Sequence, residues 1–232
     1  MTTVGLVHGA FHGAWCWERL TPELERRGMD VVAPDLPCDD PAAGVAEYAA
    51  CVDAALDGHD EVVLVGHSLG SFTVPVVTER RPVLRMIFLC SVPAGPHPDV
   101  VQDMAAMTTD EWNAAPRFHD DHGVEVLRND AARRLFFHDC SDEDAAWAVS
   151  RLRPQAPRPL QLPLPIDGWP SVPQSVVLCT DDRVVRPSWV AKAARRQLDG
   201  GEPVEMGGSH SPFLSRPSQL ADVIASVVGT SG

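Results

Sequence analysis

The chain has 232 residues, 44% of them hydrophobic and 22% charged, which is the composition of a globular protein with one sizeable core. The 32 Asp and Glu residues outnumber the 19 Lys and Arg residues, so the formal net charge is −13. Such a charge repels phosphate backbones and anionic lipid surfaces. We therefore expect neither a nucleic acid nor a membrane as a partner.

The cysteines and the apolar runs narrow the class of protein further. The six cysteines include no CxxC pair and no cysteine with a histidine at ligand spacing, which argues against a zinc site and a disulfide framework. No apolar run reaches the roughly 18 residues that a membrane-spanning helix needs, and we recognise no signal peptide. We expect reduced thiols, no metal and no cofactor in a cytoplasmic protein that is a monomer or a homodimer.

Short apolar runs alternate with helical patterns along most of the chain. Six runs are predicted as strands, over residues 2–7, 31–33, 61–65, 83–89, 175–179 and 202–206. Helical patterns cover residues 14–27 and 43–56, continue to residue 80 after the third strand, and cover residues 187–198 and 217–228. The third run has no alternating polar residues, as expected of a parallel strand covered on both faces. This order predicts an α/β fold with a mostly parallel six-stranded sheet and helices on both faces.

Residues 93–173 interrupt this alternation, so we expect them to form an inserted, mainly helical cap on a core made of residues 1–92 and 174–232. Helical patterns within the cap cover residues 109–113, 124–137 and 142–152. Thr109 and Ser141 are suitable N-cap residues, because each is followed within three positions by an acidic residue.

The end of the cap is rich in proline. Seven of the 21 prolines lie in residues 154–173, which is too many for a helix or a central strand. We interpret this stretch as an extended return from the cap to the sheet. The alternative is a flexible linker, but the interleaved apolar residues favour burial.

The sequence Gly66-His67-Ser68-Leu69-Gly70 directly follows a buried strand and directly precedes a helix. This is the context of a nucleophile elbow, a sharp turn that strains the serine backbone and needs glycines on either side of it. The turn projects the hydroxyl above the carboxyl edge of the sheet, where the amide dipoles of the following helix favour an oxyanion. Ser68 is therefore the candidate nucleophile.

A serine nucleophile needs a base, which is itself held in one tautomer by a carboxylate. Of the nine histidines, only His210 lies in a late loop between a strand and a helix, so it is the candidate base. Asp181 and Asp182 follow the predicted strand 175–179. Adjacent loop residues point in different directions, so the residues alone leave both aspartates open as the acid.

Seven segments together resemble the methylesterase and hydroxynitrile-lyase branch of the α/β-hydrolase superfamily, whose bacterial members are mostly carboxylesterases. These segments are residues 7–17, 32–37, 66–70, 137–145, 151–155, 179–182 and 208–210. The resemblance implies that Ser68, Asp182 and His210 form a catalytic triad. It also implies that the backbone amides of Ala10 and Leu69 bind the oxyanion, under a mostly helical lid over an apolar pocket.

Two positions distinguish the chemistries found within this branch. Plant-type cyanohydrin lyases carry a lysine after the catalytic histidine and a threonine in the first oxyanion loop, whereas this chain has Ser211 and Gly9 there. Both differences favour ester hydrolysis. A third difference, Ser71 in place of a glycine after the elbow, is expected to be structural.

We thus expect a carboxylesterase-type serine hydrolase that cleaves a small apolar or aromatic ester. Candidate pocket residues, chosen by motif position or as cap aromatics, are Phe11, His12, Trp112, Phe118 and Phe136. One alternative is a lyase or cyclase that uses the same triad as acid-base groups on a biosynthetic intermediate. Another is a non-catalytic ligand-binding protein of the same fold, although such proteins typically lose a triad member.

Overall fold

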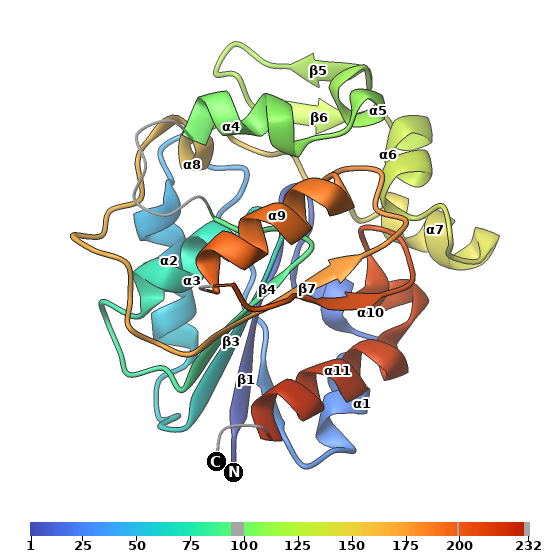
Figure 1. The fold of residues 1–232 in the computed structure, drawn as a ribbon. Coiled ribbons are helices and arrows are strands. Elements are labelled where there is room, and N and C mark those ends of the chain that lie inside the picture. The colour runs from blue at the N-terminus through green and yellow to red at the C-terminus, as the bar shows by residue number, and fades with distance from the viewer. Residues whose placement is uncertain (94–99, 199, 230–232) are drawn as a thin grey trace.

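The computed structural model describes residues 1–93, 100–198 and 200–229. Its main feature is a sheet of six parallel strands in the order β2-β1-β3-β4-β7-β8 (Figure 1). The strands are β1 (Thr3–Val7), β2 (Asp30–Val32), β3 (Val62–His67), β4 (Arg85–Leu89), β7 (Gln174–Cys179) and β8 (Val204–Met206). The predicted α/β fold with six parallel strands is confirmed. The predicted strand boundaries differ from the observed ones by no more than two residues.

Helices cover both faces of this sheet. In Figure 1, α2 (Val45–Ala55) and α3 (Gly70–Val77) lie on one side, and α1 (Thr21–Glu25) and α11 (Pro217–Gly229) lie on the other. A further helix, α9 (Pro187–Gln197), packs on β7. Because every residue of β1 and β3 is buried, these two strands form the centre of the core, which explains their unbroken apolar sequence.

The strand register determines which loops meet at the carboxyl edge. Val7 is paired with Gly66, and Gly66 is paired with Phe88, so β1, β3 and β4 end at the same level of the sheet. The loops that follow these strands therefore lie side by side, and the loops after β7 and β8 reach the same edge. Ligand sites of open α/β sheets lie at this edge.

The predicted helix 14–27 is wrong as a single element. The structure has a 3-10 turn, η1 (Ala14–Trp17), followed by the separate short helix α1. Pro22 lies at the start of α1. Proline has no amide hydrogen and its ring collides with the carbonyl group four residues earlier, which disfavours a continuous helix through this position.

The elements described between β4 and β7 lie outside the six-stranded sheet. They are α4 (Val100–Met107), α5 (Asp110–Asn113), β5 (Arg117–His119), β6 (Glu125–Leu127), α6 (Asn129–Phe136), α7 (Asp142–Val149) and α8 (Arg158–Gln161). The hydroxyls of Thr109 and Ser141 accept hydrogen bonds from the amides of Trp112 and Asp144, as expected of N-caps. Residues 94–99 of the predicted cap lie outside the described residues.

The predicted helix 124–137 is also wrong in its first part. Residues Glu125–Leu127 form β6, which pairs antiparallel with β5, and a helix begins only at Asn129. Glu125 also exchanges two backbone hydrogen bonds of 2.8 Å with Gln155 in the proline-rich return. The backbone of this segment is extended because its hydrogen-bond partners, β5 and Gln155, lie elsewhere in the chain. The local helical pattern could not reveal these partners.

The proline-rich return is extended apart from α8, and it is partly anchored. Leu164 is buried and Trp169 packs against the core, whereas Leu162 is exposed. Within the described part of the chain, no helix is both long and apolar enough to cross a membrane.

Candidate active site

The turn after β3 has the geometry of a nucleophile elbow. Ser68 has a φ of 50°, a left-handed conformation that strains a residue with a side chain. A Cβ atom at Gly66 would lie 2.7 Å from the Cα of Ser71, and one at Gly70 would collide with the carbonyl of Val7. Glycine is therefore required on both sides of the serine. The hydroxyl of Ser71 donates to the carbonyl of Gly66 at 2.7 Å, which gives this residue a structural role in the turn.

The loops after β7 and β8 bring a carboxylate and an imidazole together. Asp182 Oδ2 lies 2.6 Å from His210 Nδ1, and both side chains are buried. Asp182 Oδ1 accepts hydrogen bonds from the amides of Val184 and Val185 at 2.7 and 3.0 Å. This carboxylate is thus held in place as an acceptor, so His210 carries its proton on Nδ1 and keeps Nε2 free to act as a base.

Asp181 has different surroundings. Its Oδ2 atom accepts from the amide of Gly208 at 3.3 Å and from the hydroxyl of Thr180 at 3.2 Å, and the residue is exposed. Its carbonyl lies 3.0 Å from His138 Nε2. Of the two aspartates that the residues alone left open, Asp182 is the one that contacts His210.

Two backbone amides next to the elbow are available as donors. Among the described residues, the amides of Ala10 and Leu69 donate no hydrogen bond, and both residues line the same cavity as Ser68. The loop that carries Ala10 crosses close to the elbow, because a Cβ atom at Gly9 would lie 2.9 Å from the Cβ of Ser68. Free amides of this kind are what an oxyanion hole requires.

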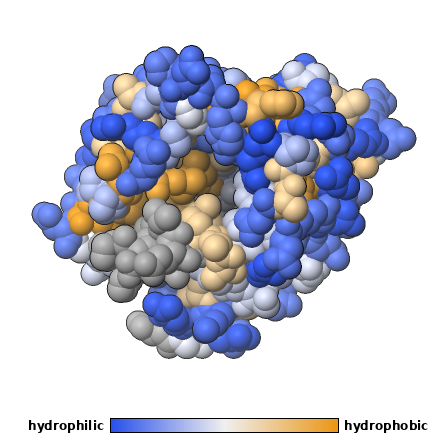
Figure 2. Space-filling view, turned by 90° about the horizontal axis from the view of Figure 1, so that it is seen from above, coloured by the Kyte–Doolittle hydropathy of each residue, from blue (hydrophilic) through white to orange (hydrophobic). Residues whose placement is uncertain are grey.

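The cavity beside Ser68 has a volume of about 60 Å³ and is lined mainly by apolar side chains. The apolar lining consists of Ala10, Leu69, Phe72, Met104, Met107, Trp112, Leu160, Val184 and Val185. Figure 2, which looks from above onto the segment between β4 and β7, shows a hollow with apolar residues in its depth within a mostly hydrophilic surface. The cavity suits an apolar ligand of modest size.

The five predicted pocket residues lie in three different places. Trp112 lines the cavity. Phe11, His12 and Phe136 form an aromatic cluster behind it, with ring centroids 6.4 Å apart for Phe11 and Phe136 and 5.1 Å apart for His12 and Phe136. Phe136 also stacks on His210 at 5.8 Å. Phe118 is 62% exposed on β5 and does not line this cavity.

Three buried histidines, His8, His12 and His67, lie next to the site, and local sequence patterns do not reveal their contacts. Burial lowers the pKa of His8 to about 4 and that of His12 to about 3, and it holds the pKa of His67 well below 6.5. All three rings are therefore neutral. The Nε2–H group of His67 donates to the carbonyl oxygen of His210 at 2.8 Å, which links the elbow to the loop of the candidate base.

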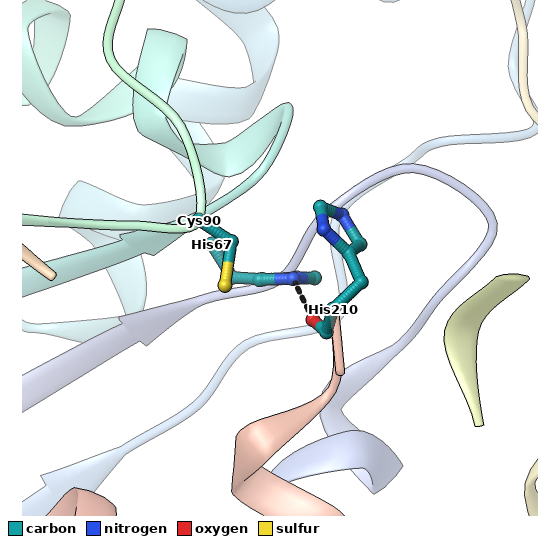
Figure 3. Close-up of side chains that lie close together, drawn as sticks. All are labelled: His67, Cys90 and His210. Carbon is teal, nitrogen blue, oxygen red and sulfur yellow. Dashed lines mark hydrogen bonds between the residues drawn. The ribbon is translucent and has the colours of Figure 1, made fainter. Parts of the chain in front are cut away.

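His67, Cys90 and His210 come close enough together to be considered as metal ligands (Figure 3). Their ligand atoms lie within 4.8 Å of one another. However, His67 donates to His210 and His210 is paired with Asp182, while the Cys90 thiol contacts the Cys179 thiol at 3.5 Å. Burial raises the pKa of the Cys90 thiol, which disfavours the thiolate that a metal would need. These three residues therefore do not fit a metal centre as they stand.

Comparisons with known proteins identify the family of the chain. The model of the alpha/beta hydrolase family matches residues 6–223. Norfluorocurarine synthase 2 of Strychnos sp is 27% identical, over 96% of this chain and 93% of the relative. The pyrethroid hydrolase of Sphingobium wenxiniae is 27% identical, over 97% of this chain and 87% of the relative. Methylesterases of Arabidopsis thaliana are also among the relatives, which confirms the resemblance to the methylesterase branch.

The solved structures show the same fold. The crystal structure of polyneuridine aldehyde esterase superposes with a TM-score of 0.78 at 21% sequence identity, and the match covers all of both chains. At this level of identity the likeness concerns the fold alone.

Proposed function

Because the chain belongs to the alpha/beta hydrolase family, we propose that it is a serine hydrolase that cleaves a small apolar or aromatic carboxylic ester. Ser68 is the nucleophile, His210 is the base, and Asp182 is the carboxylate that orients His210. The observation that carries this proposal is the buried contact of 2.6 Å between Asp182 and His210, at the sheet edge where the strained elbow ends.

The reaction proceeds through an acyl-enzyme. His210 Nε2 takes the proton of the Ser68 hydroxyl as the oxygen attacks the ester carbonyl. The amides of Ala10 and Leu69 donate to the oxyanion that forms, and Asp182 stabilises the imidazolium. His210 then protonates the departing alcohol. A water molecule that loses its proton to His210 hydrolyses the acyl-enzyme and releases the acid.

Three observations support an ester as the substrate. The cavity beside Ser68 is mostly apolar, and relatives of the chain carry the names methylesterase and pyrethroid hydrolase. Gly9 and Ser211 occupy the positions where plant-type cyanohydrin lyases carry threonine and lysine.

Residues 93–173 act as the lid over this cavity, since α4, α5 and α8 contribute Met104, Trp112 and Leu160 to its wall.

A second candidate function is a lyase or cyclase reaction on a biosynthetic intermediate. The observation in its favour is the relative named norfluorocurarine synthase 2. In such a reaction the same three residues would move protons and no acyl-enzyme would form.

The test is a panel of short-chain, aryl and methyl esters together with mandelonitrile, run on the wild type and on Ser68→Ala. We expect hydrolysis of at least one ester, a loss of activity in Ser68→Ala, and an acyl adduct on Ser68 detectable by mass spectrometry. Turnover without an adduct, or turnover of mandelonitrile alone, would favour the lyase or cyclase. Binding of panel members without any turnover would favour a non-catalytic protein.

A further inference from the structure

Among the described residues that line the cavity beside Ser68, one polar side chain has no hydrogen-bond partner and no part in the proposed reaction. Apart from Ser68, the polar side chains among the lining residues are Ser91 and Thr108. The hydroxyl of Thr108 lies 2.8 Å from both the carbonyl oxygen of Met104 and Oδ1 of Asn113, so it is paired within the protein. The hydroxyl of Ser91 has no hydrogen-bond partner among the described residues, and the residue is 1% exposed.

Ser91 lies close to the reacting centre. It follows β4 by two residues, and β4 is the direct neighbour of β3, which ends at the elbow. The amide of Ser68 donates to the carbonyl of Leu89 at 2.9 Å, so a backbone hydrogen bond joins the two segments. A ligand in a cavity of about 60 Å³ that both serines line cannot be far from either of them.

A buried hydroxyl without a hydrogen-bond partner in apolar surroundings destabilises a protein, because its desolvation is not compensated. An alanine at this position would avoid that cost without changing the backbone. Because the Ser91 hydroxyl makes no hydrogen bond where it is, rotation about χ1 towards the cavity breaks none. A ligand oxygen could therefore satisfy it, and buried polar groups of a site discriminate strongly against analogues that leave them unpaired.

Building on the ester hydrolysis proposed above, we infer that Ser91 is a specificity-determining residue that hydrogen-bonds an oxygen substituent near the scissile ester. The preferred substrates are small esters that carry a hydroxyl or keto oxygen within a few bonds of the carbonyl group. The remaining lining, including the adaptable side chains of Met104 and Met107, contacts the apolar part of such a substrate.

The experiment uses two pairs of esters in which a hydroxyl replaces a methyl group of similar size. Methyl 2-hydroxypropanoate is compared with methyl 2-methylpropanoate, and 2-hydroxyethyl acetate with propyl acetate. The first pair places the oxygen on the acid side of the ester and the second on the alcohol side. For each pair, the ratio of kcat/KM values is measured for the wild type and for Ser91→Ala.

In one of the two pairs, we expect the ratio of hydroxyl ester to methyl ester to be about tenfold higher in the wild type than in Ser91→Ala, mainly through KM. The matched control is Thr73→Val. It removes another buried hydroxyl without a partner, on α3 and outside the cavity lining, and should leave both ratios unchanged. A purely structural role of Ser91 would lower both members of a pair equally.

The outcomes separate this inference from the function on which it rests. Equal ratios in the wild type and in Ser91→Ala, with ester turnover intact, would overturn the specificity role alone. If none of the four esters is hydrolysed in a Ser68-dependent way, the result contradicts the proposed hydrolysis of these substrates, on which the role of Ser91 depends. Should Ser91→Ala fail to fold, Ser91→Cys supplies the comparison, since it keeps a side chain of similar size with only a weak donor.

Discussion

Asp181 and Asp182 are adjacent in the chain and chemically identical, yet their carboxylates have different surroundings in the fold. Asp182 is 7% exposed, accepts two backbone amides and contacts His210, whereas Asp181 is exposed and interacts with Thr180 and Gly208. The sequence limited the acid to this pair, because both follow a strand at the carboxyl edge. Only the path of the loop after β7 determines which carboxylate faces the imidazole.

The first prediction compares Asp182→Asn with Asp181→Asn. The amide at position 182 would no longer hold His210 with its proton on Nδ1 or stabilise the imidazolium, so we expect kcat for an ester to fall by about 10³- to 10⁴-fold. Asp181→Asn should remain within a few-fold of the wild type. The measurement is steady-state hydrolysis with both variants at equal folded concentration. A similar loss in both variants would mean that the charge of the loop, rather than the contact with His210, supports catalysis.

At the scale of elements, the site depends on contacts between segments that are far apart in the chain. His67 ends β3 and donates to the backbone of His210 in the loop between β8 and α10 (Pro212–Ser215). The rings of these two histidines lie 4.7 Å apart. We therefore predict that His67 is a positioning residue, which sets the distance between the elbow and the candidate base through this hydrogen bond.

This role predicts different outcomes for two substitutions of His67. His67→Phe keeps an aromatic ring but loses the donor, and we expect kcat to fall about tenfold with KM little changed, since the base is displaced while the substrate cavity stays intact. His67→Gln retains an N–H donor at a similar reach and should recover most of that loss. If the two variants lose equal activity, or if KM rises instead of kcat falling, the hydrogen bond to His210 does not position the base.

Elements whose residues are all buried could be predicted from local sequence, whereas elements that depend on distant partners could not. The buried strands β1 and β3 are continuous apolar runs, and local sequence is enough to identify them. The strand β6 was mistaken for helix because its partners, β5 and Gln155, lie elsewhere in the chain. The separate start of α1 has a local signal in Pro22, since proline favours the first turn of a helix.

At the scale of the whole molecule, three neutral histidines in the core make stability depend on pH. The folded protein holds the pKa values of His8 and His12 at about 4 and about 3, below the ordinary value of 6.5. The unfolded chain therefore binds more protons than the folded one as the pH falls below 6.5. Stability from these groups is complete above pH 6.5 and is lost as the pH falls towards 4 and below. Protonation of His8 would also break the hydrogen bond that the Leu36 amide donates to His8 Nε2 at 3.0 Å.

We expect urea unfolding midpoints to decrease steadily from pH 7 to pH 4.5. In His12→Phe the dependence of the unfolding free energy on pH should be shallower, by at most about 1.4 kcal/mol per pH unit. The control is His122→Gln, which removes an exposed histidine and leaves the buried histidines in place. Identical slopes in all three proteins would show that His12 does not contribute to the acid sensitivity.

From the amino-acid sequence we could predict the α/β architecture, the position of the elbow and the loops that carry the candidate base and acid. These features follow from local patterns: unbroken apolar runs, glycines around Ser68, and polar residues directly after strands. The folded structure was needed to show that Asp182 rather than Asp181 contacts His210 and that His67 donates to the backbone of His210. It was also needed to show that Ser91 lines the cavity without a hydrogen-bond partner among the described residues. Such contacts join residues that the chain keeps far apart, and they depend on the direction of each side chain in the packed protein, which a linear pattern does not encode.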